Sequence, residues 1–169
     1  GMHSLRVKSL YIGGGTPTSL SADQLRRLMA CMAETFTLSR IEEFTVEAGR
    51  PDCTSEEKLR ILKEYGATRI SINPQTFSDE VLRNIGRRHT AADILDCYRT
   101  ARRVGHTNIN MDLIAGLPGD TVEGFRRSLE TAISLAPENI TVHTLTLKRA
   151  SNLVVEHRAA EYDDAAAMV

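Results

Sequence analysis

The sequence lacks several features that would assign it at once to a broad class of protein. Its formal net charge is only −1, and its lysines and arginines are scattered, so no field of one sign indicates a nucleic acid or a membrane surface as a partner. No apolar run approaches the roughly 18 residues of a membrane-spanning helix, and no secretory signal peptide is recognisable. We therefore expect a cytoplasmic protein that binds neither nucleic acid nor membrane.

Cysteine is scarce, and its spacing excludes the common structural uses of thiols. The three cysteines form neither a disulfide framework nor a CxxC metal pair. Cys31 and Cys97 fall within amphipathic helical patterns, so both are predicted to be small core residues, whereas Cys53 is expected in an exposed turn. The five histidines lack zinc-ligand spacing, so no metal site is predicted in this chain.

Familiar catalytic signatures are also absent. The glycine run at residues 13–15 has no Gly-Lys-Ser/Thr end and is therefore not a P-loop, and no GxGxxG motif with a following acidic residue is present. Neither a Ser-His-Asp nor a Cys-His nucleophile arrangement can be identified from the sequence. The catalytic residues consequently stay unassigned.

Apolar periodicity predicts an α/β fold. The 169 residues suggest one domain, and a hydrophobic content of 41% is enough for a real core. Strands are predicted at 5–12, 43–47, 68–74, 108–114 and 140–147, with helices opening at Ser21, Thr54, Ser78, Thr90 and Asp120. This βαβαβααβαβ order favours parallel strands inside and helices outside. Five strands do not close an eight-stranded barrel, so we expect a partial (β/α) barrel over residues 1–150, followed by a polar tail at 151–169.

Polar residues recur where the predicted strands end. Glycines at 13–15 follow an apolar run, and they let a backbone approach a ligand closely. Glu47, Gln75 and Asp112 stand at the ends of later strands, as in the site of a parallel α/β barrel. The alternatives are a tight turn or a phosphate cradle for the glycines, and a structural cap or salt bridge for Glu47.

Two further positions allow both a structural and a ligand-binding interpretation. Arg87 and Arg88 form a pair that either lies on the solvated surface or offers a guanidinium to a ligand carboxylate. His143, on the last predicted strand, either packs in the core or points into a barrel mouth, and the core is the expectation.

Five motifs together resemble a known family, the radical S-adenosylmethionine (SAM) enzymes of the oxygen-independent coproporphyrinogen III oxidase group. The resemblance spans roughly residues 5–151, and the segments EAGRP (47–51), VHT (142–144) and KRAS (148–151) look like the coproporphyrinogen dehydrogenase branch. The five motifs are YIGGGTPT (11–18), TVEA (45–48), SINPQTF (71–77), IGR (85–87) and NMDLIAGLPG (110–119).

The resemblance implies a site for SAM. In such enzymes the glycine run contacts the methionine part of SAM through backbone groups, and polar side chains bind its other polar parts. An arginine pairs with the SAM carboxylate, and a residue of the last strand lies near the adenosine. By position, Gly14, Gly15 and Thr16 match the glycine run, and Glu47, Gln75 and Asp112 match the polar side chains. Arg87 matches the arginine, and Thr146 matches the residue of the last strand.

One family motif is absent from this sequence. The CxxxCxxC segment, whose three thiolates hold a [4Fe-4S] cluster, lies in relatives on the loop after the first barrel strand. The chain therefore looks like a fragment without that first strand, and Gly1 before Met2 is typical of a residue left by tag removal. We expect the cluster only in a full-length protein, and we expect this chain alone to be inactive.

The resemblance implies an activity for the full-length protein, the conversion of coproporphyrinogen III to protoporphyrinogen IX in porphyrin and haem biosynthesis. Such an oxidoreductase takes a porphyrinogen substrate and needs an electron donor for its cluster. The alternatives are a non-catalytic haem- or SAM-binding module and a phosphate-binding barrel enzyme. We also expect self-association of this chain, because loss of a strand exposes a sheet edge.

Overall fold

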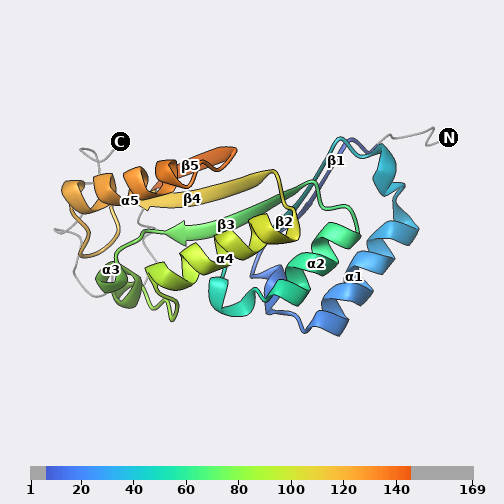
Figure 1. Ribbon diagram of the computed structural model, residues 1–169, viewed down its shortest axis with the longest axis horizontal. Coiled ribbons are helices and arrows are strands. Elements are labelled where there is room, and N and C mark those ends of the chain that lie inside the picture. Colours follow the sequence, from blue (N-terminus) through green and yellow to red (C-terminus); the bar gives the residue numbers. More distant parts are fainter. Residues whose placement is uncertain (1–6, 146–169) are drawn as a thin grey trace.

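Five parallel strands form one sheet in the computed structural model, which describes residues 7–145 (Figure 1). Their order in the sheet is their order in the chain, and every neighbouring pair is parallel, so all the carboxyl-terminal ends meet at one edge. The expected α/β architecture of a partial barrel is confirmed. Thr146 and the tail at 151–169 lie outside the described residues, so the domain boundary stays a prediction. The strands are β1 (Ser9–Ile12), β2 (Glu43–Glu47), β3 (Arg69–Gln75), β4 (Ile109–Ala115) and β5 (Asn139–Thr144).

Helices connect the strands, and their starts test the predicted caps. Capping boxes at Ser21 and Thr90 are confirmed, but Ser55 and Thr121 cap two helices predicted to open at Thr54 and Asp120. No helix within residues 7–145 is long and apolar enough to cross a membrane. The helices are α1 (Ala22–Thr35), α2 (Glu56–Glu64), α3 (Asp79–Asn84), α4 (Ala91–Val104) and α5 (Val122–Ser134), and short 3-10 turns are η1 (Pro17–Ser19), η2 (Leu38–Arg40) and η3 (Pro51–Cys53).

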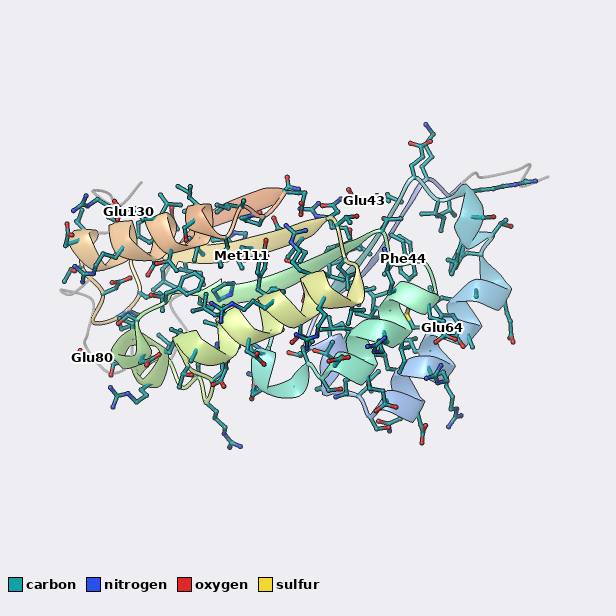
Figure 2. All side chains as sticks on the ribbon, viewed as in Figure 1. Glu43, Phe44, Glu64, Glu80, Met111 and Glu130 are labelled. Carbon is teal, nitrogen blue, oxygen red and sulfur yellow. The ribbon has the colours of Figure 1, made fainter. Side chains whose placement is uncertain are left out.

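One face of the sheet carries the hydrophobic core. Phe44 of β2 and Met111 of β4 are buried between the sheet and the helices, whereas Glu64, Glu80 and Glu130 lie on the outer helix surfaces (Figure 2). Residues from α1, α2, α4 and α5 complete this core. Burial of this apolar surface is the main favourable contribution to folding.

The cysteines test which helix faces are buried. Cys97 of α4 lies in the core as predicted, but Cys31 of α1 is exposed, and the prediction for it was wrong. The buried residues of α1 are Leu25 and Met29, four positions apart, and Cys31 lies about 200° around the helix from Met29. Cys53 is half-buried in η3.

The opposite face of the sheet is polar. Cross-strand partners include Tyr11 with Thr45, Ser71 with Asn110, and Asp112 with Thr141. Because side chains alternate between the two faces of a strand, these residues all project away from the helix-covered side. Parallel sheets are commonly apolar on both faces, so a polar face indicates a site rather than a second core.

Both edges of the sheet are open within the described part of the chain, because β1 pairs only with β2 and β5 only with β4. Unpaired strand edges favour intermolecular pairing, so we predict that this chain self-associates. Light scattering coupled to size exclusion should detect dimers or larger species. Val142→Lys on β5 should shift the population towards monomer, because an edge lysine disfavours pairing, whereas Val122→Lys on α5, at a similarly exposed valine, should not. A monodisperse wild-type monomer would contradict the prediction.

Candidate functional site

The glycine loop borders the carboxyl-terminal edge of the sheet. Gly14 and Gly15 follow β1 with φ values of 78° and 37°, a region that favours glycine, and a Cβ on either would meet open space. Gly13 has no such space, because a Cβ there would lie against the Tyr11 ring and 2.8 Å from Oε1 of Glu47. Thr16 leads from this loop into η1. The loop therefore presents backbone at the edge with little side-chain cover.

Tyr11 and Glu47 form a pair beside this loop. The Tyr11 hydroxyl donates a hydrogen bond to Oε1 of Glu47, which joins β1 to the end of β2. Partial burial of the phenol, with the hydrogen bond to Glu47 and the nearby charges of Glu47 and Asp112, raises the pKa of Tyr11 to about 12. Tyr11 therefore stays protonated at neutral pH, and its hydrogen bond orients the Glu47 carboxylate at the sheet edge.

Asp112 is held by a hydrogen-bond network on the polar face. Asn110 Nδ2 donates to Oδ1 of Asp112 at 2.6 Å and lies 2.9 Å from the Ser71 hydroxyl, which itself lies 3.3 Å from Oδ2 of Asp112. The Thr141 hydroxyl donates to the side-chain oxygen Oδ1 of Asn110 at 2.9 Å. His143 is exposed rather than packed in the core, with Nε2 4.0 Å from Oδ1 of Asp112. The Asp112 carboxylate is therefore fixed in place but still 18% exposed.

Gln75 occupies a strained position at the end of β3. Its φ is 69° although it is not a glycine, and the pairing of β3 with β4 shifts register between Ile72 and Gln75. Gln75 is buried. Residues in this left-handed region cost free energy and persist where the surroundings hold them, which makes Gln75 a candidate for function.

Arg87 lies on the short connection between α3 and α4. Burial lowers the pKa of its guanidinium, and nearby Arg50 lowers it further, while Asp52 acts in the opposite direction. Within residues 7–145 the Arg87 guanidinium forms no ion pair within 4 Å, in contrast to the surface arginines of α5. A half-buried cation without an ion-pair partner is suited to an anionic ligand.

The described residues do not fit an iron–sulfur cluster. Cys31, Cys53 and Cys97 lie on α1, η3 and α4, and no group of three or more histidine, cysteine or acidic side chains between residues 7 and 145 could hold a metal ion. Burial also raises the pKa of the Cys97 thiol to about 12, so it is not a thiolate at neutral pH. Because residues 7–145 offer no ligands for an iron–sulfur cluster, we assign no chemical step to a cluster bound by them.

The polar edge, as we call residues 13–16 with Glu47, Gln75 and Asp112, gathers the predicted residues towards one end of the sheet. Glu47 and Gln75 end β2 and β3 as predicted, but Asp112 is the middle residue of β4 on the polar face, so the prediction that it ends a strand was wrong. Arg87 stands on a separate loop, near the residues that follow β2, and Thr146 lies outside the described residues. Sequence reasoning missed the side chains that hold these groups in place. The sequence pattern that could have predicted these side chains is a polar residue at every second position within a strand, as in Asn110 and Asp112. The missed residues are Tyr11, Ser71, Asn110 and Thr141.

Comparison with known proteins identifies similar chains. The family model of the radical SAM superfamily matches residues 2–132. The oxygen-independent coproporphyrinogen-III oxidase-like protein HemZ of Bacillus subtilis is 49% identical over 152 residues, covering 89% of this chain and 30% of HemZ. The heme chaperone HemW of the same organism is 45% identical over 143 residues, covering 84% of this chain and 38% of HemW. The chain thus spans about a third of the length of these relatives.

A solved structure of similar fold agrees with these matches. Coproporphyrinogen III oxidase (HemN) from Escherichia coli, described as a radical SAM enzyme, superposes with a TM-score of 0.76 at 31% identity. The alignment covers 94% of this chain and 36% of HemN. The similarity therefore extends over nearly the whole of this chain but only a part of the solved protein.

Proposed function

Because the chain belongs to the radical SAM superfamily and to its coproporphyrinogen III oxidase-like group, we propose that the polar edge of its sheet binds SAM. One observation carries the proposal: Glu47, at the end of β2 beside the glycine loop, and Asp112, on the polar face of β4, are both held by hydrogen bonds as acceptors. A zwitterionic ligand needs such acceptors for its amino and hydroxyl groups and a cation for its carboxylate, and Arg87 supplies a guanidinium that has no ion-pair partner in the described part of the chain.

Each residue of the site has a stated role in this proposal. Backbone groups of Gly14, Gly15 and Thr16 hold the methionine part of the ligand. The side chains of Glu47, Gln75 and Asp112 accept or donate hydrogen bonds to its polar groups, and Arg87 pairs with its carboxylate. Thr146, proposed to lie near the adenosine, is outside the described residues. When bound, SAM supplies the organic radical on which this superfamily depends.

For the full-length protein we propose oxidative decarboxylation of coproporphyrinogen III to protoporphyrinogen IX, in which propionate side chains become vinyl groups. The named relatives HemZ and the anaerobic coproporphyrinogen III oxidase of Cereibacter sphaeroides, 35% identical to this chain, support this assignment. A second candidate is haem handling without catalysis, which the 45% identity to the heme chaperone HemW favours. An anaerobic assay of the full-length protein for protoporphyrinogen IX, beside a haem titration followed by absorbance, separates the two candidates.

The proposed SAM site is tested by Arg87→Gln. Because a guanidinium–carboxylate hydrogen bond contributes about 1.5–3 kcal/mol, we expect SAM to bind about 10- to 100-fold more weakly. Decarboxylated SAM lacks the group that Arg87 would bind, so its affinity should be unchanged. Isothermal titration calorimetry of the 169-residue chain with both ligands measures the difference.

Arg88→Gln is the matched control, because Arg88 is the exposed neighbour of Arg87 and has no role in the proposal. It should bind both ligands like the wild type. Equal SAM affinity in Arg87→Gln and wild type would overturn the assigned role of Arg87. A wild-type chain that ignores SAM but is stabilised by a sugar phosphate in a thermal shift assay would favour the phosphate-binding alternative.

A further inference from the structure

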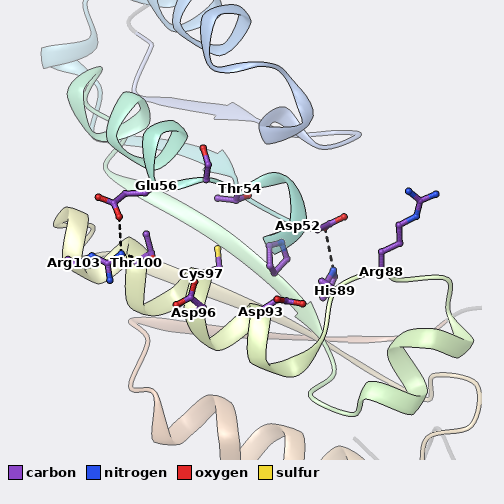
Figure 3. A pocket seen from close by; sticks show the side chains of 12 residues that line it. Asp52, Thr54, Glu56, Arg88, His89, Asp93, Asp96, Cys97, Thr100 and Arg103 are labelled. Carbon is purple, nitrogen blue, oxygen red and sulfur yellow. Dashed lines mark hydrogen bonds and ion pairs between the residues drawn. The ribbon is translucent and has the colours of Figure 1, made fainter.

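His89 is a buried histidine without hydrogen bonds. Its side chain is 1% exposed, and neither ring nitrogen has a hydrogen-bond partner among residues 7–145. Buried polar groups are normally satisfied, so such an exception calls for an explanation. The nearest opposite charge belongs to Asp52 of η3, whose Oδ1 lies 3.6 Å from Nδ1 of His89 (Figure 3). This separation allows an ion pair when the imidazole is protonated, but it is too long for a hydrogen bond.

The short connection between α3 and α4 places His89 next to Arg87. Gly86 adopts a φ of 72° after α3, and the Arg87 amide donates to the Leu82 carbonyl at 2.9 Å. The chain then passes through Arg87 and Arg88 to His89, and Thr90 caps α4. His89 is therefore the buried end of a short loop whose other end carries Arg87.

Asp52 is the opposite charge that acts on both residues. It raises the pKa of Arg87 and that of His89, against the larger effect of burial on each. The charges that face His89 are Asp52 from η3, Arg87 from its own loop and Asp93 from α4. Asp52 therefore links the loop after β2 to the loop that carries Arg87.

Open space lies beside this contact. A cavity of about 360 Å³ is lined by Asp52, Arg88 and His89, together with residues of α2 and α4 (Figure 3). Beside the contact of Asp52 with His89, the cavity rather than packed apolar side chains separates the loop after β2 from the loop between α3 and α4. Their relative position thus depends on the charges of Asp52 and His89 more than a packed junction would.

We propose that His89 and Asp52 are positioning residues that hold Arg87 in place for the carboxylate of its ligand. The inference rests on the proposed function, in which that ligand is SAM. Protonation of His89 converts its contact with Asp52 into an ion pair and adds positive charge near Arg87. Both effects favour an anionic carboxylate at Arg87, and the bound carboxylate in turn offsets the repulsion between Arg87 and protonated His89. Because burial lowers the pKa of His89 below its usual 6.5, the imidazole is protonated only in more acidic solution, and SAM should bind more tightly as the pH falls below about 6.5.

The test compares SAM with decarboxylated SAM on the 169-residue chain by isothermal titration calorimetry. At about pH 5.5 we expect His89→Gln to weaken SAM binding about tenfold and to leave decarboxylated SAM within about twofold of wild type. The pH dependence of SAM affinity should flatten in this variant. His106→Gln is the matched control, because His106 is also buried but its Nε2 contacts the Leu59 carbonyl at 3.0 Å. It should keep the wild-type pH dependence.

Asp52→Asn keeps the inference testable if His89→Gln fails to fold, because Asp52 is partly exposed. It should weaken SAM binding about as much as His89→Gln, and the double variant should be no weaker than the weaker single variant. Equal losses for SAM and decarboxylated SAM would mean that His89 is merely structural, and SAM affinity unchanged in both single variants would also overturn the inference. Failure of the wild type to bind SAM would instead remove the proposed function.

Discussion

Asp112→Asn is expected to weaken SAM binding about 10- to 100-fold while leaving the fold intact. A hydrogen bond to a charged group contributes about 1.5–3 kcal/mol, and the substitution removes both the charge and one acceptor oxygen. The remaining oxygen cannot accept from Asn110 and serve the ligand as well as a carboxylate does, because Asn110 approaches Asp112 at 2.6 Å. Calorimetric titration with SAM gives the change in affinity, and thermal unfolding reports on the fold.

Asp120→Asn is the control for this measurement. Asp120 lies in the loop between β4 and α5 and has no role in the proposal; within residues 7–145 its Oδ2 has no hydrogen-bond partner, and burial raises the pKa of its carboxyl group. An amide at this position should therefore leave the SAM affinity unchanged and should not lower the unfolding temperature. If Asp112→Asn bound SAM as tightly as Asp120→Asn does, Asp112 would have no direct part in ligand binding.

Phe44→Ala is expected to lower the free energy of unfolding by about 3–5 kcal/mol. Phe44 is 1% exposed on β2, in the core shared with α1 and α2, and its removal leaves a cavity that its neighbours fill only in part. Such a loss is a large part of the roughly 5–15 kcal/mol that stabilises a typical domain. Urea denaturation followed by circular dichroism measures it.

Ile133→Ala serves as the comparison for Phe44→Ala. Ile133 is 57% exposed on α5, so the same truncation should change the free energy of unfolding by no more than about 0.5 kcal/mol. A loss below about 1 kcal/mol for Phe44→Ala would mean that β2 does not pack against the helices as described.

Much of the fold follows from short-range patterns. Apolar alternation placed the 43–47 strand at its observed limits, and side-chain caps placed the starts of α1 and α4. The predicted cap at Thr54 was wrong because the Thr54 hydroxyl contacts the Arg50 carbonyl at 2.8 Å and the Thr18 hydroxyl at 2.9 Å. A competing bond to a residue far along the chain is invisible in a local motif, so Ser55 caps α2 instead.

Which side of a helix faces the sheet was harder to predict. Ile133 fits the apolar stripe of α5, yet the buried face runs through Phe125, Ser128 and Ala132. Ser128 is buried because its hydroxyl lies 3.1 Å from both the Thr76 hydroxyl and the Phe77 amide. A polar residue thus occupies a core position for reasons that only the tertiary contact supplies.

The candidate site divides in the same way. Glu47 could be predicted, because it ends an apolar run and a parallel sheet gathers such ends at one edge, whereas Asp112 was noticed as a carboxylate inside an apolar run and lies in the middle of β4. The partners that hold them could not, because the contact of Asp112 with Ser71 and that of Tyr11 with Glu47 depend on the register between strands. Register is decided by packing of the whole sheet rather than by any one strand.

The strand order has a consequence for how the chain is made. Each strand pairs with the one synthesised just before it and with the one synthesised just after it, so no pairing waits for a distant segment. A growing polypeptide can therefore add one strand and its helix at a time to a sheet already formed, in the direction of translation.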